Sequence, residues 1–149
     1  MGAYFNKKAY TDPALRRKYT RMGFWVNIRL IRYPDVLLMA AESANEKGLM
    51  GEASGYLEQV RAHARGTLTG VLPKVESLDQ SVLRDAIRHE RRVELALEPD
   101  RFYDLVRWGI AQEVLQAAGK NYQPKNALLP LPQTEIDKSN GVLVQNPDY

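Results

Sequence analysis

The chain has 149 residues, a formal net charge of +3 and no cysteine. Its length suits one ordinary domain with a buried core, and the absence of cysteine excludes disulfides, a thiolate nucleophile and cysteine-based metal sites within it. The sequence contains no apolar run of the roughly 18–20 residues needed to cross a bilayer, and its N-terminus lacks the apolar region of a signal peptide.

Positive charge is concentrated at the N-terminus. Residues 1–32 carry eight basic side chains and one acidic one, whereas residues 33–149 carry 13 basic and 17 acidic side chains. We expect a basic, mostly irregular segment over residues 1–30, with 11–13 as a turn or helix cap and 25–32 as a short strand or an extended lead-in. Interleaved aromatic residues are compatible with nucleic-acid binding. No nucleic-acid motif accompanies them, so we expect no such partner, and the alternative is a segment that packs on an acidic surface or is solvated.

Two helices are expected next, over residues 33–47 and 52–64. Pro34 and Asp35 favour a helix start, and Gly48 favours a stop. The short connection between the helices predicts an antiparallel hairpin. Large and small apolar residues follow the positions of a tetratricopeptide-type unit: Leu37, Ala40, Ala41, Ala44, Ala53, Leu57 and Val60. The sequence shows no second copy at a period of about 34 residues, and a single unit could not bury its face alone.

The third helix is expected to start near Ser77, with Gln80 completing a capping box, and to end at 99–100. Its apolar face, formed by Leu83, Ile87 and Leu97, also contains Glu90 and Glu94. An unpaired buried charge is costly. The third helix therefore needs cationic partners, unless the two carboxylates lie at the edge of the face and point to water.

Arginines of the following short helix, expected over residues 101–107, are the candidate partners of these carboxylates. Arginine suits a buried ion pair because its planar fork matches a carboxylate and stays charged. The sequence thus predicts a structural ion-pair network of Glu90, Glu94, Arg101, Asp104 and Arg107. Beyond it we expect a helical segment over 110–118, a proline-rich tail with one helical turn over 132–137, and an extended end over 141–149.

Signs of catalysis are weak. The stretch His89–Val93 begins like a zinc signature, but Val93 stands where the second histidine is required. Carboxylates at 90, 94 and 98 form a row, and paired carboxylates can hydrolyse glycosides; arginines close in sequence favour structural ion pairs instead. We therefore expect no enzyme, no metal and no cofactor.

Aromatic side chains offer a different kind of site, because amphipathic rings can stack on sugars. The candidates are Trp25, Tyr33, Tyr103 and Trp108. Trp108 lies at helical spacing from Leu105, which favours a role in the core. Trp25 is the better candidate for an exposed ligand-binding platform.

Three segments resemble the C-terminal region of the SusD/RagB family of nutrient-binding proteins of Bacteroidetes. Residues 31–42 (IRYPDVLLMAAE) are similar to the family run RYADVLLMYAE. The second segment joins 87–96 (IRHERRVELA) to 101–109 (RFYDLVRWG). The third joins 129–136 (LPLPQTEI) to 145–149 (QNPDY), like the family's LPIPQxEI and terminal QNPGY. The chain departs from the family at Pro34, where alanine is usual, and at 99–100, where glycine and a variable residue are usual.

The resemblance implies an all-α, tetratricopeptide-like fold of helical hairpins with long irregular loops over residues 31–149. It implies a non-catalytic, cell-surface protein of the outer membrane that binds an oligosaccharide or another nutrient. Its partner would be a SusC-like TonB-dependent porin, and its membrane attachment a lipid anchor whose cysteine this chain lacks. The matching residues are those that hold the family fold, so they imply no sugar contacts. The alternative is a tetratricopeptide-like protein-interaction module that binds no sugar.

Overall fold

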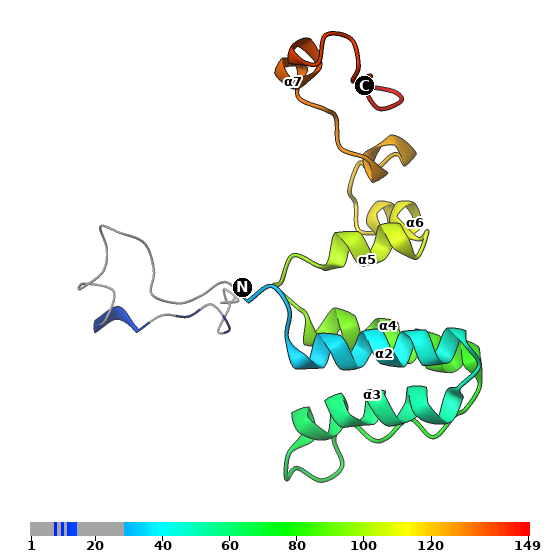
Figure 1. The fold of residues 1–149 in the computed structure, drawn as a ribbon. Helices are drawn as coiled ribbons and strands as arrows, with labels where there is room; N and C mark the ends of the chain where they lie inside the picture. Colours follow the sequence, from blue (N-terminus) through cyan, green and yellow to red (C-terminus); the bar gives the residue numbers. More distant parts are fainter. Residues whose placement is uncertain (1–7, 9, 11, 15–28) are drawn as a thin grey trace. The chain divides into compact units, whose positions relative to one another are not determined.

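Helices are the only regular elements in residues 8, 10, 12–14 and 29–149, the part of the chain that the computed structural model describes (Figure 1). The all-helical prediction is therefore confirmed for these residues. Contacts divide the chain into two units, Met1–Leu97 and Glu98–Tyr149. No feature singled out in the sequence indicates a division after residue 97, and the prediction of one domain over 31–149 stays a prediction.

The first unit is built on the expected hairpin. Helix α2 (Tyr33–Glu46) packs against α3 (Met50–Arg65) and also against α4 (Gln80–Glu94). Small residues line the seam between α2 and α3, where the helices come close. The core of this unit is continuous across the three helices and consists of Leu37, Leu38, Ala41, Ala44, Ala53, Leu57, Val60, Leu83 and Ile87.

Local signals set the ends of α2. The residue before it, Arg32, is extended, and Pro34 occupies the first turn, where its missing N–H is not needed. At the other end Gly48 has φ +78°. Its N–H donates to the Asn45 carbonyl (3.0 Å), and the N–H of Leu49 donates to the Ala44 carbonyl (2.8 Å). This pair of hydrogen bonds is a Schellman motif, which requires the left-handed backbone that glycine adopts most easily.

Glycine is less well placed inside α3. Gly55 lies within the helix, and a Cβ built on it meets nothing within 4 Å. Replacing Gly55 by alanine should therefore raise the free energy of unfolding by about 0.5–1 kcal/mol, because alanine loses less backbone entropy on folding. Urea denaturation measures this change. The contrasting variant Gly48→Ala should destabilise, and a destabilising Gly55→Ala would contradict the open face seen here.

Helix α4 begins later than the sequence predicted. The expected start near Ser77 with a Gln80 capping box is wrong, because Asp79 is the N-cap: its Oδ1 accepts from the N–H groups of Ser81 (2.8 Å) and Val82 (3.0 Å). The side chain of Gln80 donates instead to the Asn45 carbonyl (2.7 Å). Gln80 thereby ties the start of α4 to the end of α2.

The Asp79 cap makes stability depend on pH. Hydrogen bonds from the Ser81 hydroxyl and from the backbone N–H groups of Val82 and Ser81 lower the pKa of Asp79. A carboxyl group with a lowered pKa stabilises the fold above its unfolded-state pKa of about 3.9, and this contribution is lost as the pH falls through the folded-state pKa.

We therefore expect Asp79→Ala to lower the Tm at neutral pH, and the deficit to shrink as the pH falls below about 4. Thermal unfolding followed by the helix signal across this range measures it. Asp85→Ala is the control, because Asp85 is exposed on the same helix and caps nothing in its first turn. A deficit of the same size at every pH would contradict the assignment.

The loop over residues 66–79 is fastened along α3. The guanidinium of Arg65 donates to the Leu72 carbonyl from Nε (2.9 Å) and from Nη2 (2.6 Å). The Ser54 hydroxyl donates to the Val75 carbonyl (3.4 Å), and Val75 packs against the core. Side chains of α3 thus satisfy loop carbonyls that have no helix or strand to bind them.

The second unit contains α5 (Arg101–Arg107), α6 (Ala111–Ala117), the 3₁₀ helix η2 (Pro124–Ala127) and α7 (Gln133–Lys138). The predicted short helix over 101–107, the helical segment after it and the single turn near 132–137 are confirmed within one or two residues. A small core holds α5 and α6 together: Leu105, Ala111 and Tyr122, with Phe102 and Ile110 packed against them. Neither η2 nor α7 contains a buried residue.

The N-terminal segment is described only in part. Oδ1 of Asp12 accepts from the N–H of Ala14 (2.8 Å), and Pro13 and Ala14 are helical, which supports the cap alternative for residues 11–13. Residues 29–32 form no strand and lead into α2. In the described part of the chain no helix is long and apolar enough to span a membrane.

Candidate functional site

A largely buried ion pair joins α3 to α4. Nη1 of Arg61 is 2.7 Å from Oε2 of Glu90, and the two side chains are only 12% and 4% exposed. The same guanidinium donates through Nη2 to the Pro73 carbonyl (2.9 Å). Arg61 therefore holds both the buried carboxylate and the loop that passes outside it.

A second buried pair joins α2 to α4. Nη1 of Arg91 is 2.8 Å from Oδ1 of Asp35, and both residues are buried. Asp35 was expected only to favour the positive end of its helix, but it also accepts this charge-assisted bond across the interface. Each of the three helices is thus joined to a neighbour by a carboxylate–guanidinium contact.

Glu94, the last residue of α4, binds Arg32, which directly precedes α2. Nη1 of Arg32 donates to Oε1 of Glu94 (2.9 Å), and Nη2 of Arg32 donates to the Glu94 carbonyl (2.9 Å). The Lys8 ammonium also donates to the Glu94 carbonyl, and to the Ala96 carbonyl at 3.3 Å, while Arg29 donates to the carbonyl of Lys8. Cations favour the carboxyl end of a helix. Arg32 and Lys8 therefore help to cap α4, and Arg29 binds the backbone of Lys8.

The sequence predicted the carboxylates of the first unit better than their partners. Glu90 is buried, so the alternative in which it points to water is wrong. Arg61 binds Glu90 and Arg32 binds Glu94, and neither arginine is among the predicted partners. A signal for Arg61 exists in the sequence: it follows Val60 directly and lies four residues after Leu57, at the edge of the buried face of α3.

In the second unit the expected residues interact locally. Nε of Arg107 is 2.9 Å from Oδ1 of Asp104, whose side chain is buried. The guanidinium carbons of Arg107 and Arg101 lie 4.9 Å and 5.8 Å from the centre of the Trp108 ring, within range of a cation–π interaction. A single network joining Glu90 and Glu94 to Arg101, Asp104 and Arg107 stays a prediction.

A solvent-exposed ion pair joins the beginning of α4 to the end of α2. Arg84 donates to the Glu46 carboxylate from Nε (2.6 Å) and Nη2 (2.8 Å), in a bidentate arrangement. These hydrogen bonds lower the pKa of Glu46 and raise the pKa of Arg84. Because nearly half of the Glu46 side chain is exposed, water screens the pair and its contribution to stability is small.

The aromatic candidates differ in their exposure to solvent. Tyr33 and Tyr103 are 70% and 66% exposed, so each presents a ring to solvent. Trp108 is half-buried and lies beside two guanidinium groups, in agreement with a packing role. Trp25 lies outside the described residues. The described residues contain no group of three or more metal-ligating side chains of the His, Cys, Asp or Glu type.

Comparisons with known proteins agree with the fold. A SusD-family profile matches residues 2–149. SusD-like proteins P25 and P2 of Formosa agariphila are 39% and 37% identical over 98% and 80% of this chain. A crystal structure of a SusD homologue from Bacteroides thetaiotaomicron is 28% identical, with a TM-score of 0.72 over 90% of the chain.

These relatives are much longer than the chain. The matched region makes up 27% of SusD-like protein P25, 25% of P2 and 30% of the Bacteroides protein. The structural match fits the tetratricopeptide-like helical fold that the resemblance implied. Because the family profile extends over nearly every residue, the chain belongs to the SusD family.

Proposed function

We propose that this chain is part of a SusD-type protein that captures an oligosaccharide or another nutrient at the cell surface, without catalysis. Its partner would be a SusC-like TonB-dependent porin of the outer membrane, and a lipid would anchor the whole protein there. The observation that carries the proposal is the family match over residues 2–149.

The described geometry supports a scaffold role for residues 31–149 within such a protein. Two of the carboxylates considered for sugar cleavage form ion pairs instead, Glu90 with Arg61 and Glu94 with Arg32. Groups arranged in this way fix the positions of helices. We therefore assign sugar contact to aromatic rings, with Trp25 as the first candidate because tryptophan offers the largest stacking face.

Thermal unfolding with a panel of neutral oligosaccharides tests this function. A sugar held at about 100 times its Kd should add about 2.7 kcal/mol to the free energy of unfolding, which raises the Tm measurably. A shift for one class of sugar that disappears in Trp25→Ala, but persists in Tyr103→Ala, would support the assignment. A cooperative melt that no sugar shifts would contradict sugar binding by this chain.

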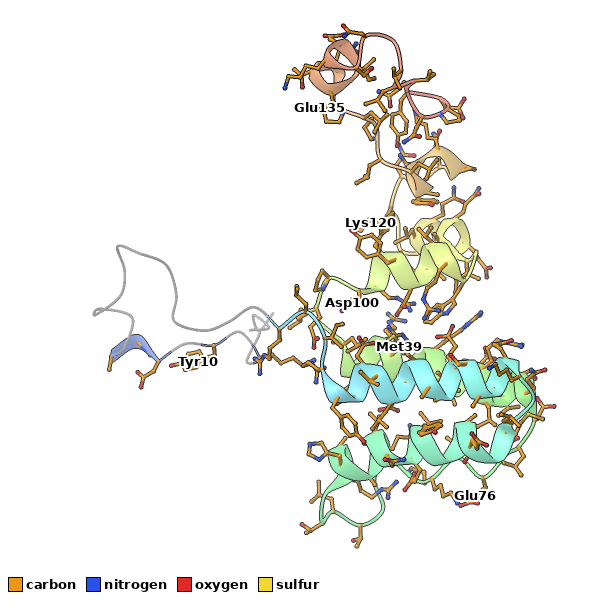
Figure 2. All side chains as sticks on the ribbon, viewed as in Figure 1. Tyr10, Met39, Glu76, Asp100, Lys120 and Glu135 are labelled. Atoms are coloured by element: carbon orange, nitrogen blue, oxygen red, sulfur yellow. The ribbon has the colours of Figure 1, made fainter. Side chains whose placement is uncertain are left out.

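One observation favours the alternative, a protein-interaction module. The exposed positions of α2 from Tyr33 to Ser43 are uncharged, and Tyr33, Val36 and Met39 are each more than 40% exposed (Figure 2 labels Met39). Solvent-facing helix surfaces normally carry charged residues. Under this alternative Met39→Glu abolishes binding of a partner protein and no sugar alters the Tm, whereas the sugar-binding function predicts that Met39→Glu leaves the sugar-induced shift intact.

A further inference from the structure

Two segments that carry the family resemblance lie against each other in the second unit. The side-chain amide of Gln145 forms a reciprocal pair with the backbone of Leu131: the Leu131 N–H donates to Oε1 (2.8 Å), and Nε2 donates to the Leu131 carbonyl (2.9 Å). An amide that binds both the N–H and the C=O of one residue reproduces the pairing of a neighbouring β-strand. Gln145 therefore binds the backbone of Leu131, in the segment over residues 128–131.

Two more side chains of the terminal segment bind the same stretch of backbone. Nδ2 of Asn146 donates to the Leu129 carbonyl (2.6 Å). The hydroxyl of Tyr149 lies 3.0 Å from the Leu128 carbonyl and 3.3 Å from the Lys125 carbonyl, so it can donate to either. The Lys125 ammonium lies 5.0 Å from the centre of the Tyr149 ring, and it donates to the Asp148 carbonyl (2.9 Å).

These polar contacts occur where apolar burial is lacking. The core of the second unit ends at Tyr122, and neither η2 nor α7 has a buried residue. Val142 and Val144, just before the terminal segment, are 81% and 79% exposed. Residues 123–149 bury little apolar surface, since Leu131 and Ile136 are only half-buried and no apolar residue among them is fully buried. The hydrogen bonds of the terminal segment are therefore a major part of the contacts that order this stretch.

We propose that residues 145–149 act as an internal peptide ligand, and that residues 125–131 are its docking site. The side chains of Gln145, Asn146 and Tyr149 form a clasp on the docking site, and this clasp holds residues 123–149 together as one body. The two segments contribute different groups: residues 145–149 contribute side chains, and the docking site contributes mainly backbone N–H and C=O groups. The inference does not depend on sugar binding, because the clasp contains none of the proposed sugar-contacting residues.

Backbone amide hydrogen exchange of the full chain, followed residue by residue by NMR, tests the clasp. The reporter is the N–H of Leu131, which donates a hydrogen bond to Oε1 of Gln145. We expect Gln145→Ala to speed exchange at Leu131 by about tenfold or more, since the amide loses its acceptor and the segment opens locally. Amides of α5 and α6 should keep their wild-type rates, because the small core of Leu105, Ala111 and Tyr122 is untouched.

Gln133→Ala is the matched control, because the Gln133 amide donates to Asp137 within α7 (2.8 Å) and lies outside the clasp. Tyr149→Phe keeps the ring but removes the hydroxyl, so it tests whether the two ends of the clasp cooperate; it should also speed exchange at Leu131. The proposal is overturned if Gln145→Ala leaves the Leu131 rate unchanged, or if Gln133→Ala raises it equally. A Leu131 rate that responds to Gln145→Ala but not to Tyr149→Phe would overturn the clasp as one unit.

Discussion

Replacing Arg61 by alanine should lower the free energy of unfolding by about 3–5 kcal/mol, because it leaves the carboxylate of Glu90 buried without its partner. Glu90 is only 4% exposed in its side chain, and the 2.7 Å contact with Arg61 is its closest charge-assisted bond in the described structure. The substitution also removes the donor to the Pro73 carbonyl. Urea denaturation followed by far-UV circular dichroism measures the loss.

A double variant separates the cost of an orphaned charge from the value of the pair. Arg61→Met with Glu90→Leu replaces both charges by apolar side chains of similar size, and should recover most of the stability. Gln59→Ala is the control for α3, since Gln59 is exposed and bonds only to the carbonyl of Gly55 in its own helix. A loss below about 1 kcal/mol for Arg61→Ala would show that water reaches Glu90.

Leu38→Ala should cost about 2–5 kcal/mol. Leu38 is fully buried, and it belongs to the core that α2 shares with α3 and α4. Truncation removes apolar contacts and leaves a cavity that three rigid helices cannot close completely. The same denaturation series gives the value.

The next residue along the chain supplies the control. Met39 is of similar size and lies on the same helix, but it is 43% exposed, so Met39→Ala should cost well under about 1 kcal/mol. Equal losses for the two variants would mean that the face of α2 that carries Met39 is covered in solution. That result would favour the protein-interaction alternative.

The elements of the first unit were predictable because their signals are local. Pro34 and Gly48 act within one turn of the helix they delimit, so the bounds of α2 follow from sequence alone. The start of α4 was misplaced by two residues because Ser77 and Asp79 are both good cap residues. Asp79 is the cap, and the Gln80 side chain donates to the carbonyl of Asn45, a partner that only the fold brings close.

Burial of Glu90 was predictable, and its partner was not. Periodicity places Glu90 on the apolar face of α4 whatever surrounds the helix. Choosing its partner requires the packing of α3 beside α4, which brings Arg61 within reach across 29 positions of sequence. Arg101 is closer in sequence, and its part in the predicted network stays a prediction. The exposed tyrosines show the same limit, because the sequence gives their chemistry but not their access to solvent.

The fastening of the 66–79 loop has a practical consequence for labelling. Arg65 and Ser54 hold its second half at Leu72 and Val75, whereas residues 67–70 are exposed. Extra length in an exposed loop costs little closure entropy. An epitope or fluorophore-binding peptide inserted between Thr69 and Gly70 should therefore be accommodated without disturbing the three-helix core. Such an insertion would give a tagged protein in which both the basic N-terminal segment and the C-terminal clasp keep their native sequence.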